Sequence, residues 1–306
     1  MKHLGMSGGG TKIPGIFGAA ESILMKGYEP THISGISAGS ILSVPIAMMR
    51  YHPEIGEQIR EIVLNLKYSD FFDKVPVNPD GSIKFGAVLR FLWKTKFGFG
   101  GGQPIALGSQ ENLKKTLSKI IKPWMYEQYK RNDKYPVCMI MAVDFLTGKR
   151  KWFNLKSLDY DTYLNAVNAS SSIPIFTPGV KMDGMHLFDG GVRDHLISAE
   201  TIRRFQHLIQ NDSKSISIYS RPEDFKIVRN RKMFDIGHVL ETNLDIMMTE
   251  ISKDDEYEEN TVCSMKGVHL QKIFLPRIAS GFYDIKKDTL RMLYASGRLK
   301  GSKVKI

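Results

Sequence analysis

A serine stands at the centre of a glycine-flanked pentapeptide near the start of the chain. Residues 35–39 read Gly-Ile-Ser-Ala-Gly and fit the pattern G-x-S-x-G. This pattern is typical of a nucleophile elbow, a sharp strand-to-helix turn that exposes a serine hydroxyl for attack on a carbonyl. Ser37 is therefore the candidate nucleophile, and Gly35 and Gly39 would let neighbouring elements approach it closely. A glycine-rich turn with a capping serine is the structural alternative.

Consecutive glycines precede the first expected helix, namely Gly8, Gly9 and Gly10. Free backbone N–H groups at the positive end of a helix dipole hold either a phosphate or the oxyanion of an acyl transfer. The loop lacks the Gly-Lys-Ser/Thr ending of a P-loop and the third spaced glycine of a dinucleotide-binding loop. An oxyanion hole made by these glycines, with the amide of Ala38, is the favoured interpretation. Lys12 either adds positive charge near an oxyanion or lipid phosphate, or is a solvated side chain.

A base has to accept the serine proton. The chain has eight histidines, and none of them lies in a recognisable triad context. In an α/β-hydrolase the nucleophile follows several strands, whereas Ser37 comes almost at once, which argues against that fold. Asp189, followed by Gly190 and Gly191, offers a carboxylate at the end of an apolar run. A carboxylate is a weak base toward a hydroxyl and must act by proximity, in concert with the attack. Asp-Gly-Gly is also a common turn.

Strand and helix patterns alternate around these residues. Runs typical of strands occupy residues 2–7, 31–34, 137–143 and 216–220, and helical spacing occupies residues 14–26, 41–49, 111–130 and 196–210. Such alternation predicts an α/β fold with parallel strands. Pro45 predicts a kink or local break in its apolar helix. Asp183 and Gly184 predict a hairpin turn between two short strands.

The remaining segments predict little further architecture. Residues 97–108, with five glycines, predict a flexible loop, and residues 253–260, rich in acidic side chains, predict an exposed segment. No internal repeat or low-complexity linker marks a boundary. The sequence therefore predicts one domain over residues 1–306.

Composition narrows the class of protein. Apolar residues make up 42% and charged residues 25%, as in soluble globular proteins. Two cysteines, Cys138 and Cys263, form no disulfide framework and favour a reducing compartment. The chain shows no secretory signal and no apolar run of about 18 residues, so we expect a cytoplasmic protein that meets membranes from outside.

The chain is basic, with 43 Lys and Arg against 32 Asp and Glu and a net charge of +11. This excess favours contact with an anionic surface, either phospholipid or nucleic acid. The positive charges are scattered, so a merely solvated basic surface is an equal alternative to a membrane-facing one. No nucleic-acid-binding motif is present, and no specific nucleic acid is expected.

Taken together, the three glycine motifs resemble the patatin-like phospholipase family in order and approximate spacing. That family has a glycine-rich oxyanion loop, an early G-x-S-x-G elbow and a late D-G-G. Two further blocks strengthen the resemblance: residues 169–178 (Ala-Ser-Ser-Ser-Ile-Pro-Ile-Phe-Thr-Pro) and residues 143–148 (Val-Asp-Phe-Leu-Thr-Gly). It covers residues 2–200 well and residues 201–306 loosely. Ile13 stands where the family loop usually has a glycine, and Val192 to Leu196 replace a common Asn-Pro pair.

The resemblance implies a three-layer α/β/α fold with a mostly parallel central sheet. It also implies a Ser–Asp dyad, in which Ser37 attacks a lipid ester and Asp189 accepts its proton, with no metal and no cofactor. Phospholipids and lysophospholipids are the implied substrates. Neutral lipase or acyltransferase activity by the same dyad, or a catalytically idle lipid-binding module, are the alternatives, and the oligomeric state is not implied.

Overall fold

The computed structural model describes residues 1–73, 84, 86–87, 93, 106–223, 236–278 and 285–306, without the side chains of residues 236–245. Most of the predicted flexible loop at 97–108 therefore lies outside the described residues. Its strands are β1 (Lys2–Met6), β2 (His32–Gly35), β3 (Val137–Asp144), β4 (Arg150–Asn154), β5 (Val180–Met182), β6 (Met185–Asp189), β7 (Lys214–Tyr219) and β8 (His269–Phe274). Its helices are α1 (Ile13–Met25), α2 (Ala38–Met48), α3 (Pro53–Leu64), α5 (Glu111–Ile120), α6 (Pro123–Arg131), α7 (Tyr160–Ser170), α8 (Ser198–Arg204), α9 (Ile236–Lys266) and α10 (Lys287–Ser302).

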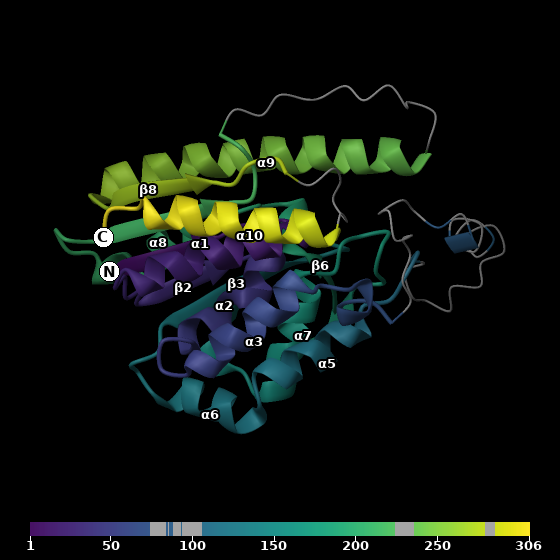
Figure 1. Cartoon of the computed structure of the whole chain (residues 1–306), viewed down its shortest axis with the longest axis horizontal. Helices are drawn as coiled ribbons and strands as arrows, with labels where there is room; N and C mark the ends of the chain where they lie inside the picture. The colour runs from purple at the N-terminus through teal and green to yellow at the C-terminus, as the bar shows by residue number, and fades with distance from the viewer. Residues whose placement is uncertain (74–83, 85, 88–92, 94–105, 224–235, 279–284) are drawn as a thin grey trace.

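The strands form one sheet in the order β5-β6-β3-β2-β1-β7-β8, and β4 also pairs with β3. Strands β3, β2, β1, β7 and β8 run parallel, whereas β4, β5 and β6 are antiparallel to their neighbours. The chain steps one way across the sheet through α1 and α2 and the other way through α9. Because such crossovers are right-handed, α1 and α2 cover one face and α9 the opposite face. Helix α10 lies along α1, as Figure 1 shows. The predicted α/β fold with a mostly parallel central sheet is confirmed.

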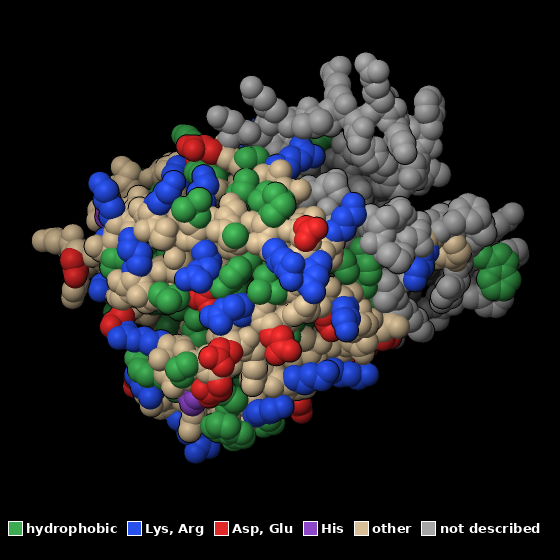
Figure 2. Space-filling view, viewed as in Figure 1, with side chains coloured by type: hydrophobic (Ala, Val, Ile, Leu, Met, Phe, Trp, Pro, Cys, Tyr) green, Lys and Arg blue, Asp and Glu red, His purple; other side chains and the backbone are tan. Residues whose placement is uncertain are grey.

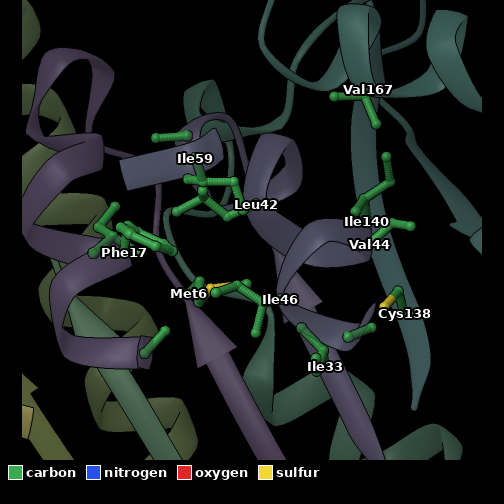
Figure 3. Close-up of a cluster of buried hydrophobic side chains, with 14 of the residues drawn as sticks. Met6, Phe17, Ile33, Leu42, Val44, Ile46, Ile59, Cys138, Ile140 and Val167 are labelled. Atoms are coloured by element: carbon green, nitrogen blue, oxygen red, sulfur yellow. The ribbon is translucent and has the colours of Figure 1, made fainter. Parts of the chain in front are cut away.

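The main core lies between the sheet and helices α1 and α2 (Figure 3). Met6 of β1, Ile33 of β2 and Ile140 of β3 are fully buried there, and Phe17 of α1 belongs to the same cluster. Nearly every side chain of α2 is buried, which is why its sequence is almost wholly apolar. The helix that begins after the candidate nucleophile is thus held firmly against the sheet.

Two helix predictions that involve prolines differ from the structure. The local break expected at Pro45 is absent, since α2 continues unbroken through that residue. Proline removes one hydrogen bond, and packing on most sides of α2 outweighs that loss. The single helical pattern expected over residues 111–130 is instead two helices, because Lys122 before Pro123 is extended.

The hairpin prediction is confirmed by backbone geometry. Asp183 and Gly184 both adopt positive φ, at 52° and 74°, and join β5 to β6. Two consecutive positive φ values are what a type I′ turn requires, and the Asp-Gly sequence supplies them at low cost.

Residues 253–260, predicted to be exposed, lie inside α9 and are exposed on one face only. Asp255 and Glu259, on the other face, are buried one turn apart. Glu259 accepts hydrogen bonds from the Ser217 hydroxyl and from the Tyr219 hydroxyl at 2.6 Å. These partners come from β7, far away in the sequence, so local composition could not show that the carboxylates would be satisfied in the interior.

On the face that carries α10 and α3, Lys and Arg side chains lie among Asp and Glu side chains and are not gathered into one patch (Figure 2). Among the described residues, no helix combines the length and apolar character needed to cross a membrane.

Candidate active site

Ser37 lies in a strained turn between β2 and α2. Its backbone has φ 51° and ψ −116°, a conformation that residues other than glycine rarely adopt. The turn is held from outside, because the Ser37 N–H donates to the carbonyl oxygen of Ser170 at 3.1 Å. This geometry places the serine at the amino end of α2, as the G-x-S-x-G pattern predicted.

The two flanking glycines allow the turn to form. A Cβ added at Gly35 would lie 2.3 Å from the carbonyl oxygen of Gly39, and one added at Gly39 would lie 2.2 Å from that of Met6. Both contacts are with backbone, which cannot rotate out of the way as a side chain could. The elbow therefore depends on β1, β2 and α2 crossing at contact distance.

We expect Gly39→Ala to destabilise the protein by about 3 kcal/mol or more, because the new methyl group must displace the β1 backbone. Gly56→Ala is the matched control, a glycine inside α3 whose added Cβ would meet only the Met49 side chain, 3.3 Å from its terminal methyl group and 3.8 Å from its Cβ. That change should stabilise the helix by up to about 1 kcal/mol. Urea denaturation followed by circular dichroism measures the free energy of unfolding of both variants. Equal stability of the two variants would contradict the close crossing of β1, β2 and α2.

Sheet register brings Asp189 to Ser37. Strand β2 ends at Gly35, which pairs with Ile140 of β3, so Ser37 lies two residues further along, level with Ala142. Ala142 pairs with Asp189, the last residue of β6, on the same side of β3 as β2, because β4 occupies the opposite side along this whole stretch. The segment after α7 links the two, since Ser170 accepts the Ser37 N–H and the carbonyl oxygen of Ser172 accepts the Asp189 N–H at 2.9 Å.

Asp189 is fully buried with one carboxylate oxygen free. Its Oδ1 accepts the Gly191 N–H at 2.7 Å, whereas Oδ2 has no hydrogen-bond partner among the described residues. Burial raises the pKa of Asp189 to about 7, and the Gly191 N–H and the nearby Ser37 hydroxyl oppose that rise. Ser37 is thus close enough to act on the carboxylate without yet bonding to Oδ2. A buried carboxylate with this pKa is a much stronger base than an exposed one.

The glycine loop crosses the site beside Ser37. A Cβ added at Gly8 would lie 3.4 Å from the Ser37 Cβ, so the two residues are in contact. The Gly8 N–H already donates to the carbonyl oxygen of His195 at 3.0 Å, which corrects the expectation that Gly8 is a free oxyanion donor. Gly10 and Ala38 line the same pocket as Ser37. Gly9, Gly10 and Ala38 remain the candidate oxyanion donors.

Hydroxyl groups fix the orientation of the Gly8–Gly9 peptide. The Gly8 carbonyl oxygen accepts from the Ser7 hydroxyl at 2.9 Å and from the Ser220 hydroxyl. The N–H of a trans peptide points opposite to its C=O, so the Gly9 N–H is directed away from these serines. Because the Ser220 proton is used on Gly8, Ser220 accepts from Nε2 of His195 at 3.2 Å, and Nδ1 of His195 has no hydrogen-bond partner among the described residues.

His195 is therefore neutral and a poor competitor for the role of base. Burial lowers its pKa to about 3, helped by the positive charges of Lys12 and Arg221. Asp189, with a pKa of about 7, holds a proton far more strongly. Lys12 itself is half-buried in the short helical turn after the glycine loop, and its charge reaches the site.

An apolar pocket opens at Ser37. Its walls come from the elbow, the segment after α3 and the segment after α7, and include Ile41, Tyr68, Phe71, Phe72 and Ile173. Polar atoms enter it from Gln110 and Ser171, whose side chains are bonded to each other at 3.0 Å. The cavity beside Ser37 is small, at ≈ 50 Å³, and mainly apolar. In the described part of the chain, no group of three or more His, Cys, Asp or Glu is placed to hold a metal ion.

Comparison with known families decides the relationship. The model of the patatin-like phospholipase family matches residues 4–197, well over half of the chain, and this span includes all three glycine motifs. The chain belongs to the patatin-like phospholipase family. At the level of that family, membership supports hydrolysis of lipid acyl esters.

Other comparisons add little detail on function. Among solved structures the chain is similar to VipD from Legionella pneumophila, at 13% identity and a TM-score of 0.45. The alignment covers 98% of this chain and 66% of VipD, slightly less than two thirds of that protein. No curated protein matches the chain.

Sequence reasoning missed the residues that hold the glycine loop of this patatin-like chain. Asp255 of α9 accepts the N–H groups of His195 and Leu196, the latter at 2.9 Å, and thereby supports the carbonyl that binds Gly8. Burial raises the pKa of Asp255 to about 8. The departure from the family at residues 192–196 was the one signal in the sequence. It could not name Ser220 or Asp255, which join it only in the folded sheet.

Proposed function

We propose that this chain is a serine acyl hydrolase that cleaves carboxylic esters of lipids through Ser37 and Asp189. The observation that carries the proposal is the unpartnered Oδ2 of a fully buried carboxylate, with a pKa near 7, beside a serine in a strained elbow. Buried polar atoms are normally satisfied, and an exception at such a site suits a reacting group. The apolar pocket at Ser37 supports a fatty acyl chain as the group transferred.

The first step forms an acyl-enzyme. Ser37 Oγ attacks the ester carbonyl carbon while its proton passes to Asp189 Oδ2, and the carbonyl electron pair moves onto oxygen. The N–H groups of Gly9, Gly10 and Ala38 stabilise that oxyanion at the positive ends of two helices. Collapse of the intermediate breaks the ester C–O bond, and Asp189 returns the proton to the leaving alcohol.

The second step reverses these roles with water. Asp189 takes a proton from a water molecule while the oxygen of that water attacks the acyl carbon. The C–O bond to Ser37 then breaks as the serine regains a proton. An alcohol in place of water would make the same dyad an acyltransferase, and a neutral lipid in place of a phospholipid would make it a lipase. An idle lipid-binding module would need neither the strained serine nor the unpartnered carboxylate.

Product analysis tests the substrate class. The purified protein is incubated with defined diacyl phospholipids, lysophospholipids and triacylglycerols, and products are identified by mass spectrometry. We expect free fatty acid from at least one phospholipid class, with one oxygen of the acid labelled in H₂¹⁸O. Transfer of the acyl chain to an added alcohol without release of labelled acid would favour the acyltransferase. Absence of turnover with intact vesicle binding would favour the idle module.

A further inference from the structure

The turn between β3 and β4 presents two adjacent apolar side chains to solvent. Phe145 is 60% exposed and Leu146 is 80% exposed. Single exposed apolar residues are common, but two in sequence at the tip of a turn lose the benefit of burial together. The same turn lies in the Val-Asp-Phe-Leu-Thr-Gly block, whose polar residues hold the turn in shape.

The exposure is enforced by hydrogen bonds. Asp144 accepts the Thr147 hydroxyl at 2.6 Å and the His186 N–H at 3.2 Å, and the Thr147 hydroxyl lowers the pKa of this carboxyl. The Phe145 N–H donates to the carbonyl oxygen of His186 at 2.7 Å, and the Gly148 N–H donates to that of Asp144 at 2.8 Å. The turn is therefore pre-organised, and Leu146 cannot fold back without breaking these bonds.

The turn lies on the same edge of the sheet as the active site. Ala142 of β3 pairs with Asp189, and Phe145 follows three residues later toward the carboxyl end of the strand. The Phe145 ring packs on Phe188, the residue before Asp189, with ring centroids 5.2 Å apart. Ile175, 41% exposed and at a strained φ of 73°, follows the pocket residue Ile173 on the segment that packs beside Asp189.

Positive charge accompanies the apolar tip. Lys149 is exposed at the end of the turn, and the exposed Arg193 guanidinium donates to the carbonyl oxygen of Gly148. The acidic groups nearby are already engaged, since Asp144 is buried in the turn and Asp194 is paired with Arg150 at 2.6 Å. Apolar side chains at a tip with cations behind them suit an interface whose surface is anionic and whose interior is hydrocarbon.

We propose that residues 145–149 dock this protein on anionic phospholipid membranes, with Phe145 and Leu146 entering the interface and Lys149 and Arg193 facing the head groups. The inference rests on the proposed function for its purpose, because docking there would present lipid to the pocket at Ser37. Binding itself needs no catalysis.

Vesicle binding by a catalytically inactive protein tests the proposal directly. The Ser37→Ala protein is titrated with vesicles of phosphatidylcholine alone or with equal phosphatidylglycerol, and bound protein is measured by flotation. Adding Leu146→Ser should weaken binding about tenfold on both, because one leucine side chain no longer leaves water. Adding Lys149→Gln instead should weaken binding about fivefold on phosphatidylglycerol vesicles only, an effect that disappears at about 1 M salt.

Leu299→Ser is the matched control, a leucine 58% exposed on α10. It should leave vesicle binding unchanged. Equal binding by Leu146→Ser and its parent, or equal weakening by Leu299→Ser, would overturn the proposal. All vesicle-binding measurements use the Ser37→Ala protein, so they report on docking alone. Product analysis of the protein that keeps Ser37 reports separately on the proposed hydrolase.

Discussion

Replacing Ser37 with alanine is expected to lower kcat/KM for ester hydrolysis by about 10⁴-fold or more, since no other group can form the acyl-enzyme. The same change should abolish covalent labelling by a fluorophosphonate probe, which reacts with activated serine hydroxyls. In the proposed mechanism, activation comes from the nearby buried carboxylate and from a backbone held at φ 51°. Gel fluorescence and peptide mass spectrometry locate the label, and hydrolysis is followed with a soluble short-chain ester.

Ser43→Ala is the matched control for this experiment. Ser43 is buried in the same helix, and its hydroxyl donates to the Gly39 carbonyl at 2.9 Å instead of facing the pocket. The control protein should still be labelled at Ser37. Hydrolysis that survives in Ser37→Ala, or a label found on another serine, would show that the nucleophile has been wrongly assigned.

Much of the site could be predicted because it depends on glycines. Gly35 and Gly39 are required by backbone contacts of 2.3 and 2.2 Å, so the sequence carries a direct record of where chains cross. The hairpin at Asp183 is visible for a related reason, since positive φ restricts the residue types allowed. The elbow and the position of Asp189 at the end of a strand both followed from such local constraints.

What could not be predicted depends on partners far apart in the sequence. The buried carboxylates of Asp255 and Glu259 look like solvated charges until β7 and the residues after Asp189 meet them. The Gly8 amide looks free until the carbonyl of His195 accepts it. Sequence indicates that a group is able to bond, whereas register and packing decide with which group it does so.

Asp189→Asn is expected to lower kcat/KM by about 10³-fold or more, because an amide keeps the shape of the carboxylate but cannot accept the Ser37 proton. The folded protein should survive the change. The pKa of Asp189 in the folded protein, about 7, lies above its value in the unfolded chain. The protein therefore loses stability as pH rises between these two pKa values. At pH 8 the asparagine variant should therefore unfold at a temperature equal to or above that of the parent, which calorimetry measures.

The pH dependence of the parent identifies the base independently. Asp189 accepts a proton only when ionised, so log kcat/KM should rise with a slope of about one as pH approaches 7 and then level off. If the neutral His195 were the base, the corresponding rise would fall near pH 3, the pKa that its burial gives it. A profile that is flat from pH 5 to pH 8 would exclude Asp189. Asp189 and His195 are both buried beside one glycine loop, so geometry alone leaves both within reach of the site. The pH at which kcat/KM rises distinguishes them.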